Sequence, residues 1–98
     1  MKAVSAILVI ALFAFPLAAA AEDGAALYKT NCAMCHKVDG SGNPAMKAPD
    51  LRAEAVQKMD VARLAEAIKA QPKHTAKIKA FTQDQLTAVA TFVKSLKK

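Results

Sequence analysis

The polar and apolar positions near the C-terminus predict a helix with a well-defined start. Thr82-Gln83-Asp84-Gln85 has the form of a capping box, in which the first and fourth residues exchange side-chain and backbone hydrogen bonds. Phe81 and Leu86 flank this box at the spacing of a hydrophobic staple. The apolar residues that follow recur at helical intervals: Leu86, Val89, Ala90, Val93 and Leu96. We expect this stripe to be the buried face of the C-terminal helix.

Two further helices are expected upstream. Asp60 is a candidate N-cap for a helix from Val61 to about Ala70, which Gln71-Pro72 ends. The apolar face of this helix carries Val61, Leu64, Ala65 and Ile68. Asp23 precedes a shorter helix that includes Tyr28. Because no run of alternating β-branched residues is present, the predicted fold class is all-α, with three to four short helices.

The N-terminal segment has the pattern of a secretory signal peptide. Lys2 forms a short basic region, Val4 to Leu17 is almost wholly apolar, and a run of alanines follows. We expect cleavage after Ala20 or Ala21, which assigns residues 1–21 to the signal and residues 22–98 to one exported domain. An uncleaved membrane anchor is the alternative, although the apolar stretch is short for a span that needs about 20 residues. The predicted location is the periplasm.

Cys32-Ala33-Met34-Cys35-His36 carries the candidate chemistry. Two thiols separated by two residues on one helical turn can each add to a haem vinyl group, and the following imidazole is carried beneath the iron. The motif therefore predicts one covalently bound haem c, with Cys32 and Cys35 as thioethers and His36 as the proximal ligand.

Three other interpretations of the motif fit the sequence less well. A thioredoxin-like redox pair requires βαβ surroundings, which the pattern does not offer. A structural zinc site requires four ligands, and Cys32, Cys35, His36 and His74 do not have the spacing of a common zinc module. A simple disulfide leaves the adjacent histidine unexplained.

Size and charge agree with an exported haem domain. A domain of under about 80 residues cannot bury a large core unaided, and a covalently held porphyrin supplies the missing apolar volume. The chain of 98 residues has a net charge of +6, which becomes +5 when Lys2 is removed with the signal. A basic surface favours acidic partners or anionic surfaces, and because the chain is expected to be exported, we expect no nucleic-acid partner.

The mature chain resembles the small monohaem class I cytochromes c of bacterial periplasms. Gly24 and Tyr28 stand where that family has a glycine and an aromatic residue on its N-terminal helix, and Val89 and Phe92 match the pair on the C-terminal helix that crosses it. Ala48-Pro49-Asp50-Leu51 is similar to the family's Gly-Pro-x-Leu segment, with alanine in place of glycine. The resemblance implies the class I cytochrome c fold and a Pro49 carbonyl that holds the haem histidine.

The sixth ligand departs from the family pattern. Members usually carry a methionine between the third helix and the C-terminal helix, but this chain has no methionine after Met59. His74 lies in that interval, eight residues before Thr82. We therefore predict bis-histidine ligation with His74 as the distal ligand and Met59 as the fallback. The remaining alternatives are Met46, Lys73, Lys77 and an open sixth position.

The resemblance implies a single-electron carrier rather than an enzyme, and no residue is assigned a catalytic role. Its expected partners are redox proteins with acidic docking surfaces, with no small-molecule substrate and at most peripheral membrane contact. Lysines around the haem edge would steer such partners, with an ordinary solvated surface as the alternative role for these residues: Lys29, Lys37, Lys47, Lys73, Lys77 and Lys79. The alternatives are a haem-based sensor or peroxidase-like module, and a haem subunit of a larger oxidoreductase.

Overall fold

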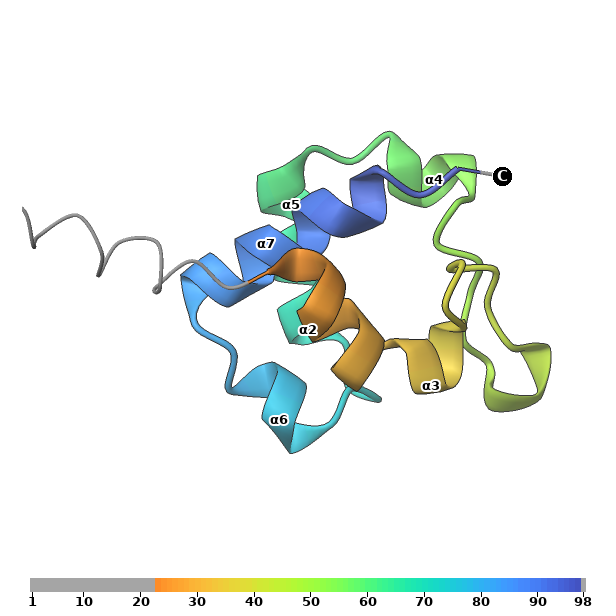
Figure 1. Ribbon diagram of the computed structural model, residues 1–98, viewed down its shortest axis with the longest axis horizontal. Coiled ribbons are helices and arrows are strands. Elements are labelled where there is room, and N and C mark those ends of the chain that lie inside the picture. The colour runs from red at the N-terminus through yellow and green to blue at the C-terminus, as the bar shows by residue number, and fades with distance from the viewer. Residues whose placement is uncertain (1–22, 98) are drawn as a thin grey trace, which may run out of the picture.

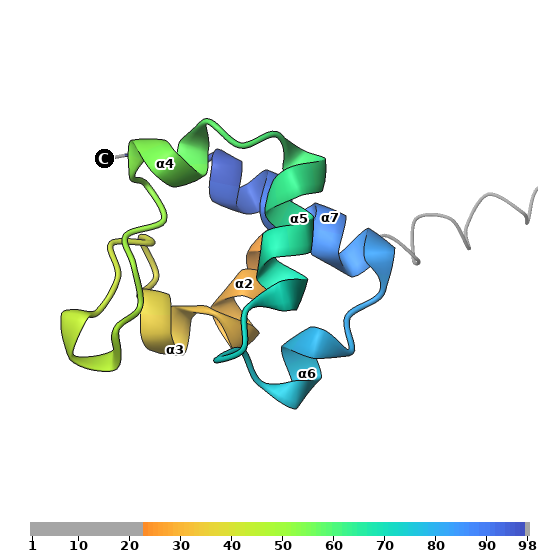
Figure 2. The same ribbon diagram turned by 180° about the vertical axis from the view of Figure 1, so that it is seen from behind.

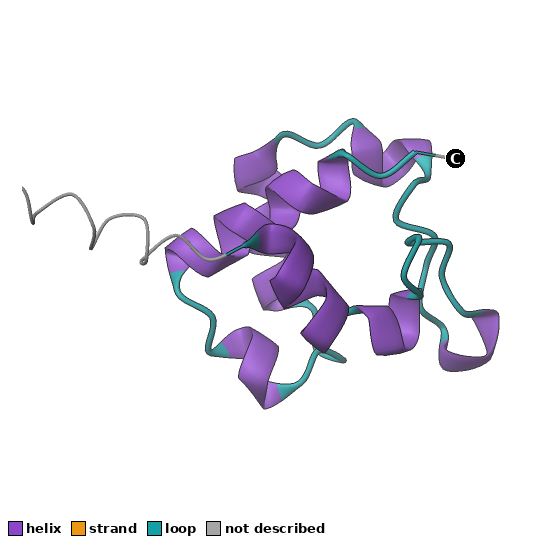
Figure 3. Ribbon diagram, viewed as in Figure 1, coloured by secondary structure: helices purple, strands orange, loops and turns teal. Residues whose placement is uncertain are grey.

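The computed structural model describes residues 23–97 and shows an all-α protein, as predicted (Figure 1, Figure 3). Within these residues there are six α-helices and one short 3₁₀ helix, and the only extended pairing is an isolated bridge between Asn43 and Ala48. The elements are α2 (Gly24–Asn31), α3 (Ala33–His36), η2 (Pro44–Met46), α4 (Glu54–Gln57), α5 (Val61–Ala70), α6 (Ala76–Lys79) and α7 (Gln83–Lys94). The predicted signal peptide, residues 1–21, lies outside the described part.

Helix α7 forms the centre of the core, and it begins where the sequence indicated. The Thr82 Oγ1 atom accepts from the Gln85 backbone N–H at 3.1 Å, and the Gln85 Oε1 atom accepts from the Thr82 N–H at 2.8 Å. Both bonds of the capping box are therefore present. The predicted stripe is buried at Leu86, Val89, Ala90 and Val93. Phe81 is buried as well, while Leu96 is half-buried beside the core.

Helix α2 crosses α7 at very close range. A Cβ atom added to Gly24 would lie 2.2 Å from the Ala88 carbonyl oxygen and 3.3 Å from Phe92 Cβ, so the crossing requires glycine. One turn further on, Tyr28 is only 2% exposed, and its ring centroid lies 5.2 Å from that of Phe92. These contacts fix α2, and with it the start of the Cys-x-x-Cys-His segment, against the C-terminal helix.

Helix α5 crosses α7 on the face opposite α2, as Figures 1 and 2 show from the two sides. Asp60 caps its N-terminus, with its Oδ1 atom accepting from the Arg63 N–H at 2.8 Å. Leu64 and Ala65 point into the core and join the residues of α7 in one apolar cluster. Helix α6 lies in the connection between α5 and α7, and its residue Ile78 is also buried in this cluster.

Side-chain bonds tie the segment around α4 to α7. The Gln57 Nε2 group donates to the carbonyls of Leu51, at 2.8 Å, and Val93, at 3.0 Å. Lys94 Nζ donates to the carbonyls of Gln57, at 2.5 Å, and Met59. Lys94 therefore satisfies carbonyl groups at the end of α4, where intrahelical partners are lacking.

None of the helices between residues 23 and 97 has both the length and the apolar character of a membrane-spanning segment.

Candidate functional site

A large, mostly apolar cavity lies between the helices and the loop that follows α3. Its volume is about 690 Å³, which is within the range of cofactor-binding pockets. Side chains such as Leu51, Leu64, Ile68 and Val93 form its apolar walls. The polar groups are few, and they include the two thiols and both imidazoles of the chain. The cavity therefore brings together residues that lie far apart in the sequence.

The Cys-x-x-Cys-His segment forms a single helical turn, α3, at the edge of this cavity. The Cys32 carbonyl accepts from the backbone N–H groups of Cys35, at 3.1 Å, and His36, at 2.9 Å. This turn places both half-buried thiols and the His36 ring on the wall of the same cavity. Met34 points elsewhere, because its side chain is 79% exposed and does not line the cavity.

Cys32 does not have the electrostatics of a redox-active cysteine. Burial, and secondarily the neighbouring Cys35, raise the pKa of the Cys32 thiol to about 11. Reactive cysteines in disulfide oxidoreductases have thiol pKa values lowered to between about 3.5 and 7.5. Cys32 is therefore a neutral thiol in the protein without attached haem, which argues against the thioredoxin-like interpretation.

The imidazole of His36 is buried, with 9% exposure, and its orientation is fixed by Pro49. Its Nδ1 atom lies 3.0 Å from the Pro49 carbonyl oxygen, and since a carbonyl only accepts, Nδ1 carries the proton. The Nε2 atom is left with its lone pair. Burial lowers the pKa of His36 and outweighs the opposing effect of the Pro49 bond, while His74 lowers it further. The neutral ring is the form that binds a metal ion.

Gly42 allows the Pro49 carbonyl to approach His36. The sequence pattern alone does not reveal this role. The φ angle of Gly42 is +87°, and its N–H donates to the His36 carbonyl at 2.9 Å. A Cβ atom at this position would lie 2.6 Å from the Ala48 oxygen and 2.8 Å from the Pro49 oxygen. Only glycine permits this approach without displacing the carbonyl. In the sequence, the only indication of this role is the run of turn-forming residues from 39 to 44, which predicts a loop.

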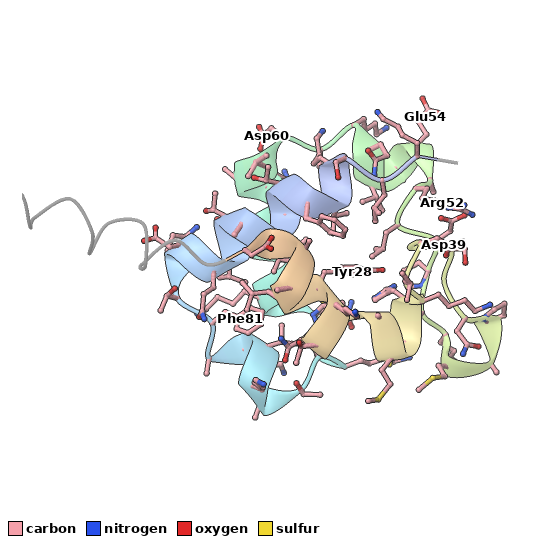
Figure 4. All side chains as sticks on the ribbon, in the orientation of Figure 1. Tyr28, Asp39, Arg52, Glu54, Asp60 and Phe81 are labelled. Carbon is pink, nitrogen blue, oxygen red and sulfur yellow. The ribbon has the colours of Figure 1, made fainter. Side chains whose placement is uncertain are left out.

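The phenol of Tyr28 supports the same turn from the other side. Its hydroxyl donates to the Lys37 carbonyl at 2.7 Å, directly after the motif. In Figure 4 the Tyr28 side chain points from α2 toward the segment that follows α3. The sequence indicated only that Tyr28 is the aromatic residue of the N-terminal helix. Its polar end therefore has a second function, which is to hold the end of the Cys-x-x-Cys-His turn.

His74 occupies the turn between α5 and α6, and its ring faces the same cavity. The ring centroids of His36 and His74 are 6.4 Å apart, with an angle of 75° between the ring planes. Two imidazoles bound through nitrogen on opposite sides of one metal ion, at about 2.0 Å per bond, have centroids about 6.3 Å apart. The His74 Nδ1 atom lies 2.7 Å from the Ile68 carbonyl oxygen, so this Nδ1 is also the protonated atom and Nε2 is available.

The other candidate ligands are distributed unequally. Met59, Met46 and Lys73 line the cavity together with His74, whereas Lys77 is not among its lining residues. Met46 is half exposed, at 49%. Met59, which is half-buried in the cavity wall, therefore remains the main alternative to His74 as the distal ligand.

Comparison with known proteins identifies the family. The family model for cytochrome c matches residues 21–97. The chain belongs to the cytochrome c family. A solved structure with a similar fold, the KustC0563 c-type cytochrome, is 26% identical, with a TM-score of 0.66 over 79% of this chain and 100% of that one. No curated protein matched the chain.

The cofactor of this cytochrome is covalent haem c, and the residues present fit it. The cavity is apolar and of cofactor size, and its wall carries two thiols at the spacing that the vinyl groups require. His36 offers Nε2 in a fixed tautomer. When bound, haem c supplies one-electron exchange between ferrous and ferric iron. Family membership thus supports a haem c-type electron carrier.

Proposed function

We propose that this cytochrome is a periplasmic carrier that shuttles single electrons between redox proteins, with His36 and His74 as the two axial ligands. The observation that carries the proposal is the pair of imidazoles on one cavity with ring centroids 6.4 Å apart. This distance agrees with the spacing that one shared metal ion requires.

The hydrogen bonds of the two rings support the same assignment. Each imidazole donates its Nδ1 proton to a backbone carbonyl, Pro49 for His36 and Ile68 for His74. Histidines that bind metals nearly always donate their second ring N–H in this way, which fixes the tautomer and makes the ring a stronger donor. A solvated histidine in a basic loop has no need of such a bond. The bond at His74 therefore favours a ligand over a surface residue.

Ligation by two imidazoles has two chemical consequences. Side chains fill both axial positions, so no position is left for a substrate, which favours electron transfer over sensing or peroxidase chemistry. A methionine axial ligand raises the reduction potential in cytochromes c, so replacing the usual methionine with His74 lowers it. We therefore expect a potential below that of an otherwise similar His/Met cytochrome.

Optical and electron paramagnetic resonance spectra of the ferric, haem-loaded protein test the ligation. We expect a low-spin spectrum without the weak red sulfur-to-iron band. His74→Ala should convert the spectrum to high-spin or ligand-exchanged. Met59→Leu is the matched control, because it removes the fallback ligand, which also lines the cavity, and it should leave the low-spin spectrum unchanged. A sulfur-to-iron band in the wild-type protein that Met59→Leu abolishes would assign the iron to Met59 instead.

The surface supports acidic redox partners. The six lysines that we expect to steer acidic partners toward the haem edge are all exposed. Two of them, Lys47 and Lys73, also line the cavity. Exposed apolar side chains at Met34, Val38 and Met46 add a contact area that charge alone would not provide. We expect electron-transfer rates with acidic partners to fall as ionic strength rises. Rates that do not depend on salt would show that these lysines are ordinary surface groups.

Export is tested by the N-terminus of the mature protein. A cleaved signal peptide predicts a periplasmic chain that begins at Ala21 or Glu22, with the mass of one haem added. Intact-mass spectrometry of the periplasmic fraction distinguishes this result from a membrane-bound chain that retains residues 1–21.

A further inference from the structure

The C-terminal end of α5 leaves its last carbonyls without helical donors, and the Ile68 carbonyl is the first of them. The last intrahelical-type bond at this end joins the Gln71 N–H to the Ala67 carbonyl at 3.2 Å. The next bond would run from residue 72 to the Ile68 carbonyl, but residue 72 is proline and has no N–H. Gln71 is already extended, with φ −65° and ψ 117°, as expected for a residue that precedes proline. Pro72 therefore both ends α5 and leaves the Ile68 carbonyl available.

A tight turn then brings His74 back toward that carbonyl. The His74 backbone N–H donates to the Gln71 carbonyl at 3.1 Å, and this closes a four-residue turn with Pro72 in its second position, where proline is favoured. The Gln71 side chain accepts from the Lys73 N–H at 3.2 Å, and Lys79 Nζ donates to the Pro72 carbonyl at 3.3 Å. The turn is therefore held from within and from α6.

The His74 ring replaces the missing backbone donor. Its Nδ1 lies 2.7 Å from the Ile68 carbonyl, the group that an N–H at position 72 would reach if the helix continued through Gln71. The C-terminus of a helix carries a partial negative charge, and histidine side chains there stabilise it by donating to the last carbonyls. One hydrogen bond thus caps α5 and orients the ring whose Nε2 faces the haem cavity.

We infer that Pro72 is a positioning residue for the distal ligand: by withholding a backbone donor from the Ile68 carbonyl, it reserves that carbonyl for His74. This inference rests on the proposed ligation by His74. Donation of the Nδ1 proton into the negative end of α5 makes His74 a stronger donor, which favours ferric iron and lowers the reduction potential. A residue with an N–H at position 72 would compete for the carbonyl and weaken this effect.

Pro72→Ala tests the inference in the full, haem-loaded protein. Two quantities are measured: exchange of the His74 Nδ1 proton with solvent, by nuclear magnetic resonance in the ferrous state, and the reduction potential. We expect exchange at His74 to become faster by about fivefold, the factor for losing one net hydrogen bond. Exchange at His36 should stay unchanged, and the potential should rise. A merely structural proline would alter neither the exchange of one specific ring proton nor the potential.

Pro44→Ala is the matched control, because Pro44 is exposed at the first position of η2, and its removal has the same general effect on the unfolded chain. Unchanged exchange and potential in Pro72→Ala, or equal changes in both variants, would overturn the inference. If Pro72→Ala does not fold, the wild-type protein decides through the scalar coupling across the hydrogen bond between His74 Nδ1 and the Ile68 carbonyl carbon. Presence of the coupling supports the inference, and its absence overturns it.

Failure of the ligation and failure of this inference give different results. If His74→Ala keeps the wild-type low-spin spectrum, the proposed ligation is wrong, and the inference fails with it. If His74→Ala loses that spectrum while Pro72→Ala behaves as wild type, the ligation stands and only the role of Pro72 is refuted.

Discussion

Replacing Gly42 with alanine should weaken the hydrogen bond between the Pro49 carbonyl and His36. The added Cβ atom would lie 2.8 Å from the Pro49 oxygen, which is closer than real Cβ atoms approach an oxygen. Gly42 is also bonded to the His36 carbonyl, so it cannot move away without breaking that contact. The Pro49 carbonyl must therefore shift, and the distance from its oxygen to His36 Nδ1 must grow from 3.0 Å.

The expected cost has two parts. An alanine at a φ angle of +87° introduces backbone strain of roughly 1–3 kcal/mol. The lengthened bond between Pro49 and His36 adds about 1 kcal/mol, the net value of one hydrogen bond. Gly42→Ala should therefore lower the free energy of unfolding by roughly 2–4 kcal/mol. The reduction potential should rise as well, because a weaker Nδ1 hydrogen bond makes His36 a poorer donor.

Gly40→Ala provides a matched control on the same loop. Gly40 has a φ angle of +79°, so the backbone strain is comparable, but its added Cβ would meet the Leu96 Cδ1 atom at 2.7 Å. That atom is the end of a flexible side chain and can give way, and no carbonyl of the haem site is touched. Denaturant unfolding measures the loss of stability in both variants, and protein-film voltammetry measures their reduction potentials. Backbone strain should destabilise both variants, whereas displacement of the Pro49 carbonyl should raise the potential of Gly42→Ala alone. Equal losses of stability, with an unchanged potential in both variants, would refute the reasoning.

Three further outcomes are expected. Gly24→Ala should destabilise the protein by at least roughly 1–3 kcal/mol, because the added methyl group would lie 2.2 Å from the Ala88 carbonyl oxygen and must push α2 away from α7; an unchanged thermal midpoint would contradict the close crossing. Burial raises the pKa of Tyr28 to about 12, so the phenol stays neutral in the folded state while the unfolded chain ionises above pH 10. Between pH 10 and 12 the wild type should lose about 1.4 kcal/mol of stability per pH unit relative to Tyr28→Phe, and parallel pH profiles would exclude this contribution. Lys94→Met should lower the free energy of unfolding by about 1.5–3 kcal/mol, since the carbonyls at the end of α4 lose a charged donor, and urea titration showing no change would disprove that role.

The sequence predicts the long helices because their signals are local. The capping box at Thr82, the cap at Asp60 and the apolar stripes each depend on residues within a few positions of one another, and α5 and α7 begin where those signals stand. The one-turn helices α4 and α6 carry too few residues for a periodic pattern and are held by tertiary contacts. The bounds of these helices therefore could not be predicted from the sequence pattern.

The candidate site divides in the same way. The Cys-x-x-Cys-His motif predicts its own geometry, because one helical turn is enough to place the thiols and His36 together. The carbonyl that orients His74 could not be assigned, because Ile68 reaches the ring only through the turn that Pro72 closes. The missing N–H of Pro72 was visible in the sequence, but the side chain that takes its place was not.

A crystal structure of the ferric, haem-loaded protein tests the central claim most directly. We predict that His74 Nε2 lies about 2.0 Å from the iron on the face opposite His36, with Nδ1 still bonded to the Ile68 carbonyl. A Met59 sulfur in that position, or an iron with no side chain on that face, would contradict the proposed ligation.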